Sequence, residues 1–452
     1  MGADQVTPRM FQAVCLAQRV FALCWRHKAR GWSGRQKFRR SDYSVSVMNR
    51  QAPPTPNTMV AEFPVLRIAL ALSLGSAVSL GLARFAYGLL LPPMRADLGW
   101  SYALAGAMNT SNAAGYLLGA LAAPWLLRRT SAGAMVLAGC AAASVLMLLG
   151  GLLTDSALWL LHRLVAGVAS ALVFMTGGLL AARLAAADPQ RGGLLIGIYY
   201  GGIGVGISLS ALLVPAVVAM AERSADAWAS AWFALALLCF AGTAVLLWPV
   251  ARLDGLPMAA PSPGVAIAAV PLRRFSFALV GYALFGMGYI GYMTFVIALL
   301  REQGLTAAAI TAFYALLGVA VMFSARLWAG LLDRYRDGRP LALLNGLLGL
   351  ATILPALSSA WPLVFSSGLL FGAVFVSTVA STTALVRHNL PPAQWASGIG
   401  AFTIVFAAGQ MVGPAVVGWI ADGPGGLARG FIVSAGMLWL GAVTALRQRA
   451  LQ

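Results

Sequence analysis

Long apolar stretches separated by short polar turns run along most of the chain after residue 60. Stretches of about 20 apolar residues can cross a bilayer as helices, and no alternating pattern of a membrane β-barrel is seen. The pattern predicts an all-α polytopic membrane protein with twelve spanning helices; a runner-up count of eleven or thirteen depends mainly on the marginal stretch 11–25. The twelve expected helices lie at 66–92, 102–127, 133–153, 156–182, 192–220, 228–250, 275–300, 306–332, 340–358, 361–386, 393–420 and 428–446.

Composition and charge agree with this class and exclude a soluble protein. The 452-residue chain is 60% hydrophobic and 10% charged, which leaves too little charge for a water-facing surface. Its net charge of +18 comes mainly from arginines that concentrate in the tails and in alternate loops. This bias predicts that both termini lie in the cytoplasm, and it argues against a nucleic-acid partner.

A shift of 205 residues lays the second half of the chain on the first. The same offset relates two separate pairs of expected helices, which indicates an internal repeat of two six-helix bundles. The aligned residues are Gly81, Arg84 and Tyr87 with Gly286, Tyr289 and Tyr292; Asp97, Gly99 and Ser101 with Glu302, Gly304 and Thr306; and Gly167 with Gly372.

The repeat divides the chain into an N-terminal bundle at 64–251 and a C-terminal bundle at 275–449. A Pro- and Ala-rich segment at 252–274 is the expected cytoplasmic linker. Residues 1–60 are basic and Pro-rich, and they predict a disordered extension that a downstream start methionine would omit.

Two loop sequences carry a resemblance to a known family. The segment GLLDRYRDGR is similar to the G-x-L-x-D-R-x-G-R loop of the major facilitator superfamily, with two residues inserted. The equivalent first loop, GALAAPWLLRR, keeps two arginines but has Ala123 where the family has aspartate. More narrowly, LGLARFAYGLLLPPM and NAAGYLLGAL resemble the YbfB/YjiJ-type branch of that superfamily.

The resemblance covers about residues 64–447 and implies alternating access around a central cavity. In this family the first, fourth, seventh and tenth helices line the cavity, and the loop aspartate latches the bundles together on the cytoplasmic side. The cytoplasmic latch implied here consists of Gly330, Asp333, Arg334, Gly338, Arg339, Arg128 and Arg129.

Arg84 and Arg163 place positive charge inside two of the cavity helices. A charge at the centre of a membrane costs about 2.5–3.5 kcal/mol even on a mild scale. Counted from the helix ends, Arg84 lies roughly 12 Å and Arg163 roughly 10 Å below the outer surface. No acidic residue falls in the middle of a span, so a transported anion is one possible counter-ion. The alternative is structural: Arg163 braces its helix, and Arg84 caps carbonyls loosened near Gly81 or Gly88.

Other polar side chains are expected at a similar depth. Asn109, Asn112 and Tyr116 form one stripe on the second helix, and Tyr289 and Tyr292 share a face of the seventh. Contacts between helices explain such residues as well as contacts with a cargo do. The full set of expected cargo contacts is Arg84, Arg163, Tyr87, Asn109, Asn112, Tyr116, Tyr289, Tyr292 and Gln410.

These features predict a secondary active transporter that moves a small solute, and an organic anion in particular, across a bacterial cytoplasmic (inner) membrane. No P-loop is present, so an ion gradient or a counter-substrate would drive symport or antiport. His162 is the candidate for proton coupling because histidine titrates near neutral pH. The alternatives are an exporter of neutral sugars or amphipathic drugs, and a sensor or scaffold that does not transport.

An enzyme is not expected, because the chain has three histidines, no clustered metal ligands and no catalytic carboxylate pair. The expected partners are the solute, the lipid bilayer and a co-transported proton or ion. No cofactor, metal or nucleic acid is expected, and the protein is expected to be a monomer.

Overall fold

The structure, a computed structural model, describes residues 65–188, 190–221, 227–253, 270–391 and 394–451. Every regular element in these ranges is helical, and eleven helices are long and apolar enough to cross a membrane. A further helix of 26 residues, α5 (Tyr102–Leu127), carries the polar stripe and completes the twelve. The predicted all-α fold is confirmed, whereas the extension at 1–60 and most of the linker lie outside the described residues.

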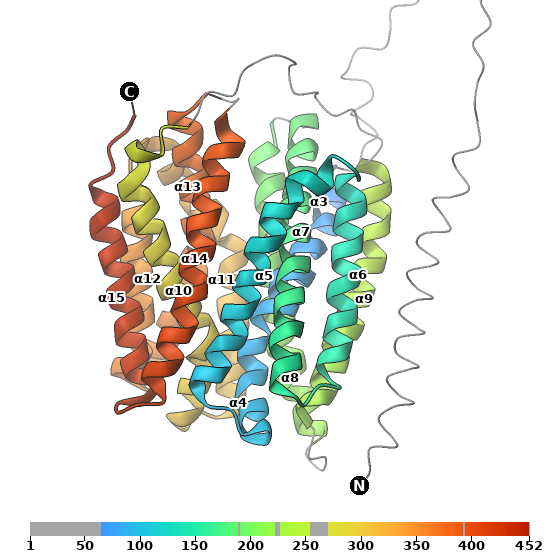
Figure 1. The fold of residues 1–452 in the computed structure, drawn as a ribbon, viewed down its shortest axis with the longest axis vertical. Helices are drawn as coiled ribbons and strands as arrows, with labels where there is room; N and C mark the ends of the chain where they lie inside the picture. Colours follow the sequence, from blue (N-terminus) through green and yellow to red (C-terminus); the bar gives the residue numbers. More distant parts are fainter. Residues whose placement is uncertain (1–64, 189, 222–226, 254–269, 392–393, 452) are drawn as a thin grey trace, which may run out of the picture. The chain divides into compact units, whose positions relative to one another are not determined.

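Within each half, the spans follow one another with short connections (Figure 1). The first half holds an interrupted helix made of α3 (Val65–Ser76), η2 (Ala77–Phe85) and α4 (Tyr87–Leu98), then α5, α6 (Ala132–Gly150), α7 (Ser156–Ala187), α8 (Gly192–Met220) and α9 (Ala227–Leu253). The second half holds the short η3 (Leu272–Phe275), α10 (Ser276–Glu302), α11 (Ala307–Arg334), α12 (Arg339–Leu357), α13 (Trp361–Asn389), α14 (Trp395–Ala421) and α15 (Gly426–Leu446).

The first span ends later than predicted. It continues through Pro92 and Pro93 to Leu98, although each proline removes a backbone donor and crowds the carbonyl four residues earlier. Gly99 ends it by taking a left-handed conformation with φ 65°, from which its N–H donates to the carbonyl of Arg95. Glycine adopts this conformation without steric cost, so the glycine and not the proline is the stop signal.

The repeat offset relates equivalent structural positions. Gly304, like Gly99, has a positive φ, of 79°. Ser101 caps α5 and Thr306 caps α11, each by accepting a hydrogen bond from the backbone N–H three residues later. These pairs show that the turn after the first span of each half is built in the same way.

Helix packing repeats at the same offset. A Cβ built at Gly167 of α7 would lie 2.0 Å from the carbonyl oxygen of Asn112 in α5. A Cβ at Gly372 of α13 would lie 2.3 Å from the carbonyl oxygen of Leu317 in α11. Because the offset maps both members of one pair onto the other, α5 packs on α7 in the register in which α11 packs on α13.

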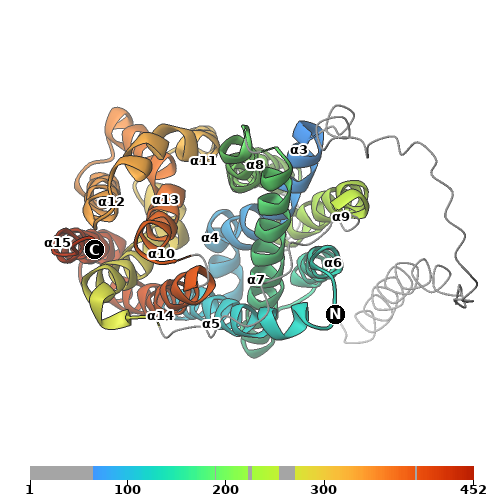
Figure 2. The same ribbon diagram turned by 90° about the horizontal axis from the view of Figure 1, so that it is seen from above.

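Viewed along the helices, the elements α3–α9 and α10–α15 form two groups that lie side by side (Figure 2). The most extensive contacts between the groups are those of α5 with α14 and of α8 with α11, followed by those of α4 with α10. The two groups are called the N-terminal and C-terminal bundles below.

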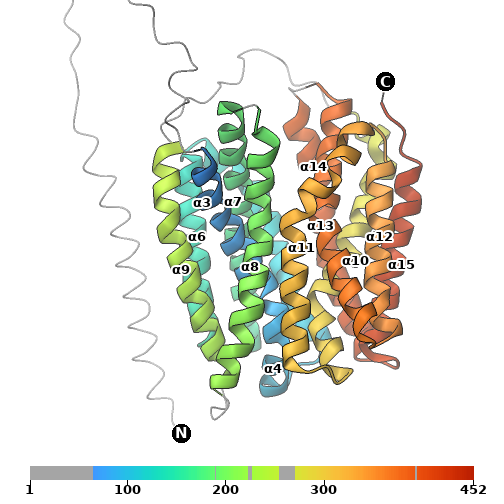
Figure 3. The same ribbon diagram turned by 180° about the vertical axis from the view of Figure 1, so that it is seen from behind.

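The two ends of the bundle pair differ in how the bundles meet. We call the end that holds the loops 99–101, 303–306 and 422–425 the closed end, and the opposite end, where α3 begins and α15 ends, the tail end (the lower and upper ends of Figures 1 and 3). On the predicted topology, the closed end faces the outside and the tail end faces the cytoplasm.

Hydrogen bonds between the bundles gather toward the closed end. Thr110 Oγ1 donates to the Met411 carbonyl (2.7 Å), and Ser208 Oγ donates to the Ala315 carbonyl (3.1 Å). Eight hydrogen bonds between described residues of the two bundles, these two included, all join positions on the closed-end side of the helix midpoints. The hydrogen bonds that join the two bundles therefore lie on the side that is predicted to face the outside.

Candidate functional site

Arg84 lies near the end of η2, a π-helical segment in the middle of the first span. The segment includes the point where Gly81 meets Gly206 of α8, since a Cβ at Gly81 would lie 2.6 Å from the Gly206 Cα atom. Its last turn is held by side chains from other helices. The carbonyl of Ala83 accepts from Arg163 Nη1 (3.1 Å), and the carbonyl of Phe85 accepts from a tyrosine hydroxyl of α11 (2.9 Å). π-helical turns are frequent at functional sites.

The Arg84 side chain is buried, with 4% of its surface exposed, and it connects the two bundles. Its Nη2 donates a hydrogen bond to Oε1 of Gln410 on α14. The guanidinium carbon lies 5.5 Å from the ring centroid of Tyr116 and 5.9 Å from that of Phe85. Its Nε is buried and finds no hydrogen-bond partner among the described residues. All of these contacts are with uncharged groups.

Arg163 is fully buried and is held within the N-terminal bundle. Besides its bond to Ala83, it donates from Nη2 to Oδ1 of Asn109 (3.1 Å). Its guanidinium carbon lies 4.8 Å from the ring centroid of Tyr87. Arg163 thus joins α7 to the first span and to α5, beside the turn that carries Arg84.

The polar stripe of α5 completes this network. Asn109 Nδ2 donates to Thr294 Oγ1 of α10 (2.7 Å), which links Arg163 to the C-terminal bundle. Asn112 Nδ2 donates to the backbone carbonyl of Arg163 (3.0 Å), and the Tyr87 hydroxyl donates to a backbone carbonyl of α5 (3.1 Å). The stripe therefore connects helices, whatever further role it has.

An aromatic wall from the C-terminal bundle lies beside this network, since the ring of Phe85, next to Arg84, meets that of Phe375 edge to face (5.8 Å between centroids). The Tyr289 ring stacks with Phe285 (4.8 Å between centroids), Phe406 (5.6 Å) and Phe375 (6.0 Å). The hydroxyls of Tyr289 and Tyr116 have no hydrogen-bond partner in the part of the chain that the structure describes. Aromatic stacking of this kind offers an apolar surface beside the cation.

Two predicted residues have their contacts elsewhere. The Tyr292 hydroxyl lies 2.7 Å from Ser367 Oγ, inside the C-terminal bundle. His162 Nε2 lies 2.7 Å from a backbone carbonyl of α6, and the ring packs against Trp159 and Trp232. The partners of His162 all belong to the N-terminal bundle. The proton-coupling role of His162 stays a prediction.

The cytoplasmic latch residues lie at the tail end. Asp333 is exposed and makes no ion pair with any described residue. Arg339 instead pairs with Asp337 at 3.3 Å, next to Gly338 at the start of α12. Ala123, at the position of the missing aspartate, is buried. The latch also stays a prediction.

Sequence reasoning did not single out the fastening at the closed end. Asp422 of the C-terminal bundle accepts hydrogen bonds from the backbone N–H groups of Tyr102 (2.7 Å) and Ala103 (2.8 Å), the first residues of α5. The Tyr102 hydroxyl also donates to the carboxylate of Glu302, and its ring lies 3.8 Å from the Arg95 guanidinium carbon. A carboxylate at a helix N-terminus is favourable. The sequence showed these acidic residues at helix ends, but not which helix each would meet.

Comparison with known proteins decides the family. Residues 76–446 match the family described as uncharacterised MFS-type transporter YbfB. The chain belongs to this family. The resemblance to the major facilitator superfamily is thereby confirmed, and the chain is a multi-span membrane transporter of that superfamily.

Solved structures of other major facilitator transporters share the fold. The nucleoside transporter NupG is 14% identical with a TM-score of 0.66, covering 85% of this chain and 99% of that one. A bacterial homologue of the human lysosomal transporter Spinster is 15% identical with a TM-score of 0.62, covering 85% and 98%. The E. coli fucose:proton symporter FucP is 15% identical with a TM-score of 0.56, covering 85% and 98%. No curated protein sequence matches the chain. Identities this low show the common fold alone.

Proposed function

We propose that this transporter is a secondary carrier of a small organic anion, which binds at Arg84 and crosses the membrane by alternating access. The observation that carries the proposal is the charge of the site. Arg84 is buried among uncharged groups, and the described acidic residues lie at helix ends or in loops. A buried cation without a counter-ion is costly, and an anionic cargo would supply the missing charge.

Arg84 is better suited to hold the cargo than Arg163 is. Arg163 already donates to two acceptors, and its charge adds positive potential to the same network. Arg84 donates to one amide oxygen only, while the Nε atoms of both arginines are unpaired within the described structure. Its planar fork matches a carboxylate or phosphate in two-point contact.

The surroundings of Arg84 favour a cargo with one anionic and one uncharged end. Positive charge comes from the N-terminal bundle, and the wall around Tyr289 comes from the C-terminal bundle. A flat or apolar group stacked on that wall would leave its carboxylate near Arg84. The two hydroxyls without partners, on Tyr116 and Tyr289, are then available to hydrogen-bond the cargo.

The same site gives the cargo a means to affect the conformational change. The hydrogen bond between Arg84 and Gln410 joins the two bundles, and Gln410 Nε2 is buried without a described hydrogen-bond partner. A cargo carboxylate that takes the place of the Gln410 oxygen would separate this pair. A ligand shifts an equilibrium only by binding the two states differently, and this exchange supplies such a difference.

The second candidate is an uncharged solute with a ring. Gln410 satisfies one Arg84 donor without any charge, and stacked aromatic rings accept uncharged rings. The fold relatives include a nucleoside transporter and a fucose:proton symporter. Binding that survives the loss of the Arg84 charge would favour this candidate.

The test is a cargo affinity paired with a melting curve for Arg84→Gln and Arg84→Lys, after a thermal-shift screen of organic acids and their neutral analogues. A charge-assisted contact is worth about 1.5–3 kcal/mol, so Arg84→Gln should weaken binding roughly ten- to a hundredfold. Arg84→Lys keeps the charge but loses the fork, and it should restore binding only in part.

The melting temperature of Arg84→Gln should hold, because the change removes a buried charge. A variant that binds as well as the parent but melts earlier makes Arg84 a structural residue. Binding without flux in reconstituted vesicles would favour a sensor over a carrier. We also propose that the protein resides in a bacterial cytoplasmic membrane with both termini in the cytoplasm, on the basis of the arginine bias of its loops.

A further inference from the structure

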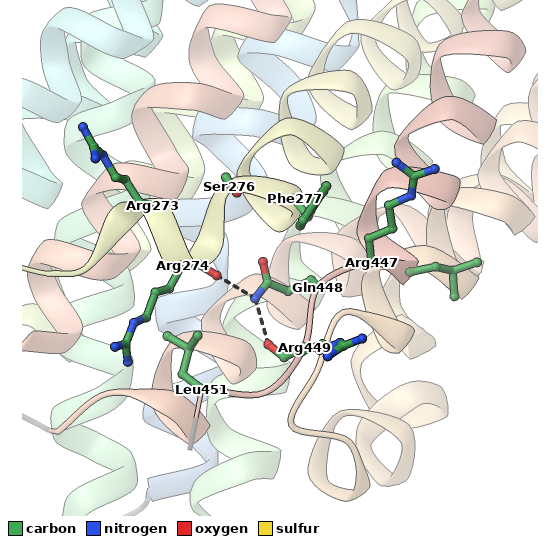
Figure 4. A pocket seen from close by; sticks show the side chains of 9 residues that line it. Arg273, Arg274, Ser276, Phe277, Arg447, Gln448, Arg449 and Leu451 are labelled. Carbon is green, nitrogen blue, oxygen red and sulfur yellow. Dashed lines mark hydrogen bonds between the residues drawn. The ribbon is translucent and has the colours of Figure 1, made fainter.

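A basic pocket of about 640 Å³ opens at the tail end, between the start of α10 and the end of α15. Figure 4 shows Arg273 and Arg274 on one side of it, Arg447 and Arg449 on the other, and Gln448 between them. All four arginines are exposed, and none forms an ion pair with any described acidic residue. The pocket is therefore a concentrated positive site at one end of the membrane-spanning helices.

Gln448 builds the floor of this pocket. Its side chain is buried, with 4% exposed, and its Nε2 donates to the backbone carbonyls of Arg274 (2.9 Å) and Arg449 (2.8 Å) (Figure 4). Its Oε1 accepts from the backbone N–H of Ala278 (3.2 Å). One buried amide thus fixes the two chain segments that carry the arginines.

An apolar groove adjoins the basic pocket. It has a volume of about 490 Å³ and is lined by residues of α11, α12 and α15. Leu446 lines both the groove and the basic pocket. Leu343 in the groove is 45% exposed and Leu446 is 62% exposed, as expected of side chains that face lipid. Basic and apolar surfaces are continuous here.

We propose that the basic pocket and the groove together bind one anionic phospholipid. Its phosphate lies among the arginines, and an acyl chain lies in the groove over Leu343 and Leu446. Arginine contacts phosphate oxygens in two-point fashion. Basic pockets at the cytoplasmic ends of membrane helices suit anionic headgroups. A free anion would use the pocket alone, so the adjoining apolar groove is what favours a lipid.

The test compares lipid retention by the purified full-length protein in detergent, measured by native mass spectrometry with phosphatidylglycerol and phosphatidylcholine. The pocket variant is Arg274→Gln/Arg449→Gln. The matched control is Arg252→Gln/Arg387→Gln, which removes two exposed arginines at the same end, each beside a tryptophan ring. The parent should prefer phosphatidylglycerol. The pocket variant should retain it roughly tenfold less, and the control should retain it as the parent does.

Three results would overturn the proposal. Equal retention of the two lipids means that charge is not recognised, and equal loss in both variants means diffuse attraction to the protein surface. Competition by inorganic phosphate as strong as by unlabelled phosphatidylglycerol means that the pocket takes a free anion. If the pocket variant has a lower melting temperature than the parent, Leu446→Ser provides the test instead. This substitution should weaken retention of phosphatidylglycerol, and unchanged retention would overturn the proposal of a bound lipid.

Discussion

The fastening at the closed end makes the conformational balance sensitive to one carboxylate. Asp422 reaches from the C-terminal bundle to the N-terminus of α5, where its two oxygens accept from the N–H groups of Tyr102 and Ala103. These contacts join the bundles, so they exist only while the closed end is closed. Asp422→Asn keeps the shape of the side chain but removes the charge and one of the two acceptors.

The size of the effect follows from the exposure of this carboxylate. A charge-assisted hydrogen bond is worth about 1.5–3 kcal/mol, and the helix dipole adds about 0.3–1 kcal/mol. Asp422 is exposed, and water will screen and replace part of both contributions. We therefore expect a loss of about 1.4 kcal/mol, which shifts the balance roughly tenfold toward the arrangement that opens this end.

The assay is a distance distribution between labels on cysteines placed at Ala96 and Ala307, which are exposed at the closed end on different bundles. The native cysteines are replaced first. Asp155→Asn is the matched control, because Asp155 caps α7 inside its own bundle by accepting from the Leu158 N–H (2.9 Å). Equal shifts in both variants, or no shift in Asp422→Asn, would refute the reasoning.

Two further predictions concern the tail end. Asp333 makes no ion pair with a described residue in the present arrangement, which is closed toward the predicted outside. Asp333→Asn should therefore favour this arrangement over the one in which the cytoplasmic latch forms. Unchanged populations of the two arrangements in distance measurements would remove the latch role of Asp333. A cysteine at position 261, in the linker, should react only with reagents supplied from the cytoplasmic side, and labelling from outside would reverse the topology.

Much of the fold could be predicted from the sequence because each span is specified locally. An apolar run of sufficient length has no alternative to a helix in a bilayer, since its backbone groups must bond internally. The interruption at η2 could not be predicted in this way. Its last turn is stabilised by donors from α7 and α11, far away in the chain. Apolar periodicity contains no information about such distant donors.

The candidate site was predictable in part for the same reason. Two arginines and the asparagines of α5 stand out as polar residues in apolar runs. Their partners do not, because the pairing of Arg84 with Gln410 and of Asn109 with Thr294 depends on the register between the two bundles. That register is set by close backbone contacts such as Gly106 against the Pro414 carbonyl, which only the assembled structure shows.

The two buried arginines should respond differently to the same substitution. Arg163→Gln leaves the Ala83 carbonyl and the Asn109 amide oxygen without their donor, and each unpaired buried group costs about 1–3 kcal/mol. We therefore expect Arg163→Gln to lower the melting temperature. Arg84→Gln leaves only one acceptor, Gln410 Oε1, without its donor, and it removes a buried charge that has no counter-ion, so the two effects oppose each other and its melting temperature should hold. Any loss of cargo affinity in Arg163→Gln should then follow the loss of folded protein, and affinity per folded molecule should hold. A variant that melts like the parent but no longer binds the cargo would instead make Arg163 a second anchor for the anion. Affinity that is lost while the melting temperature holds requires direct contact between the side chain and the cargo.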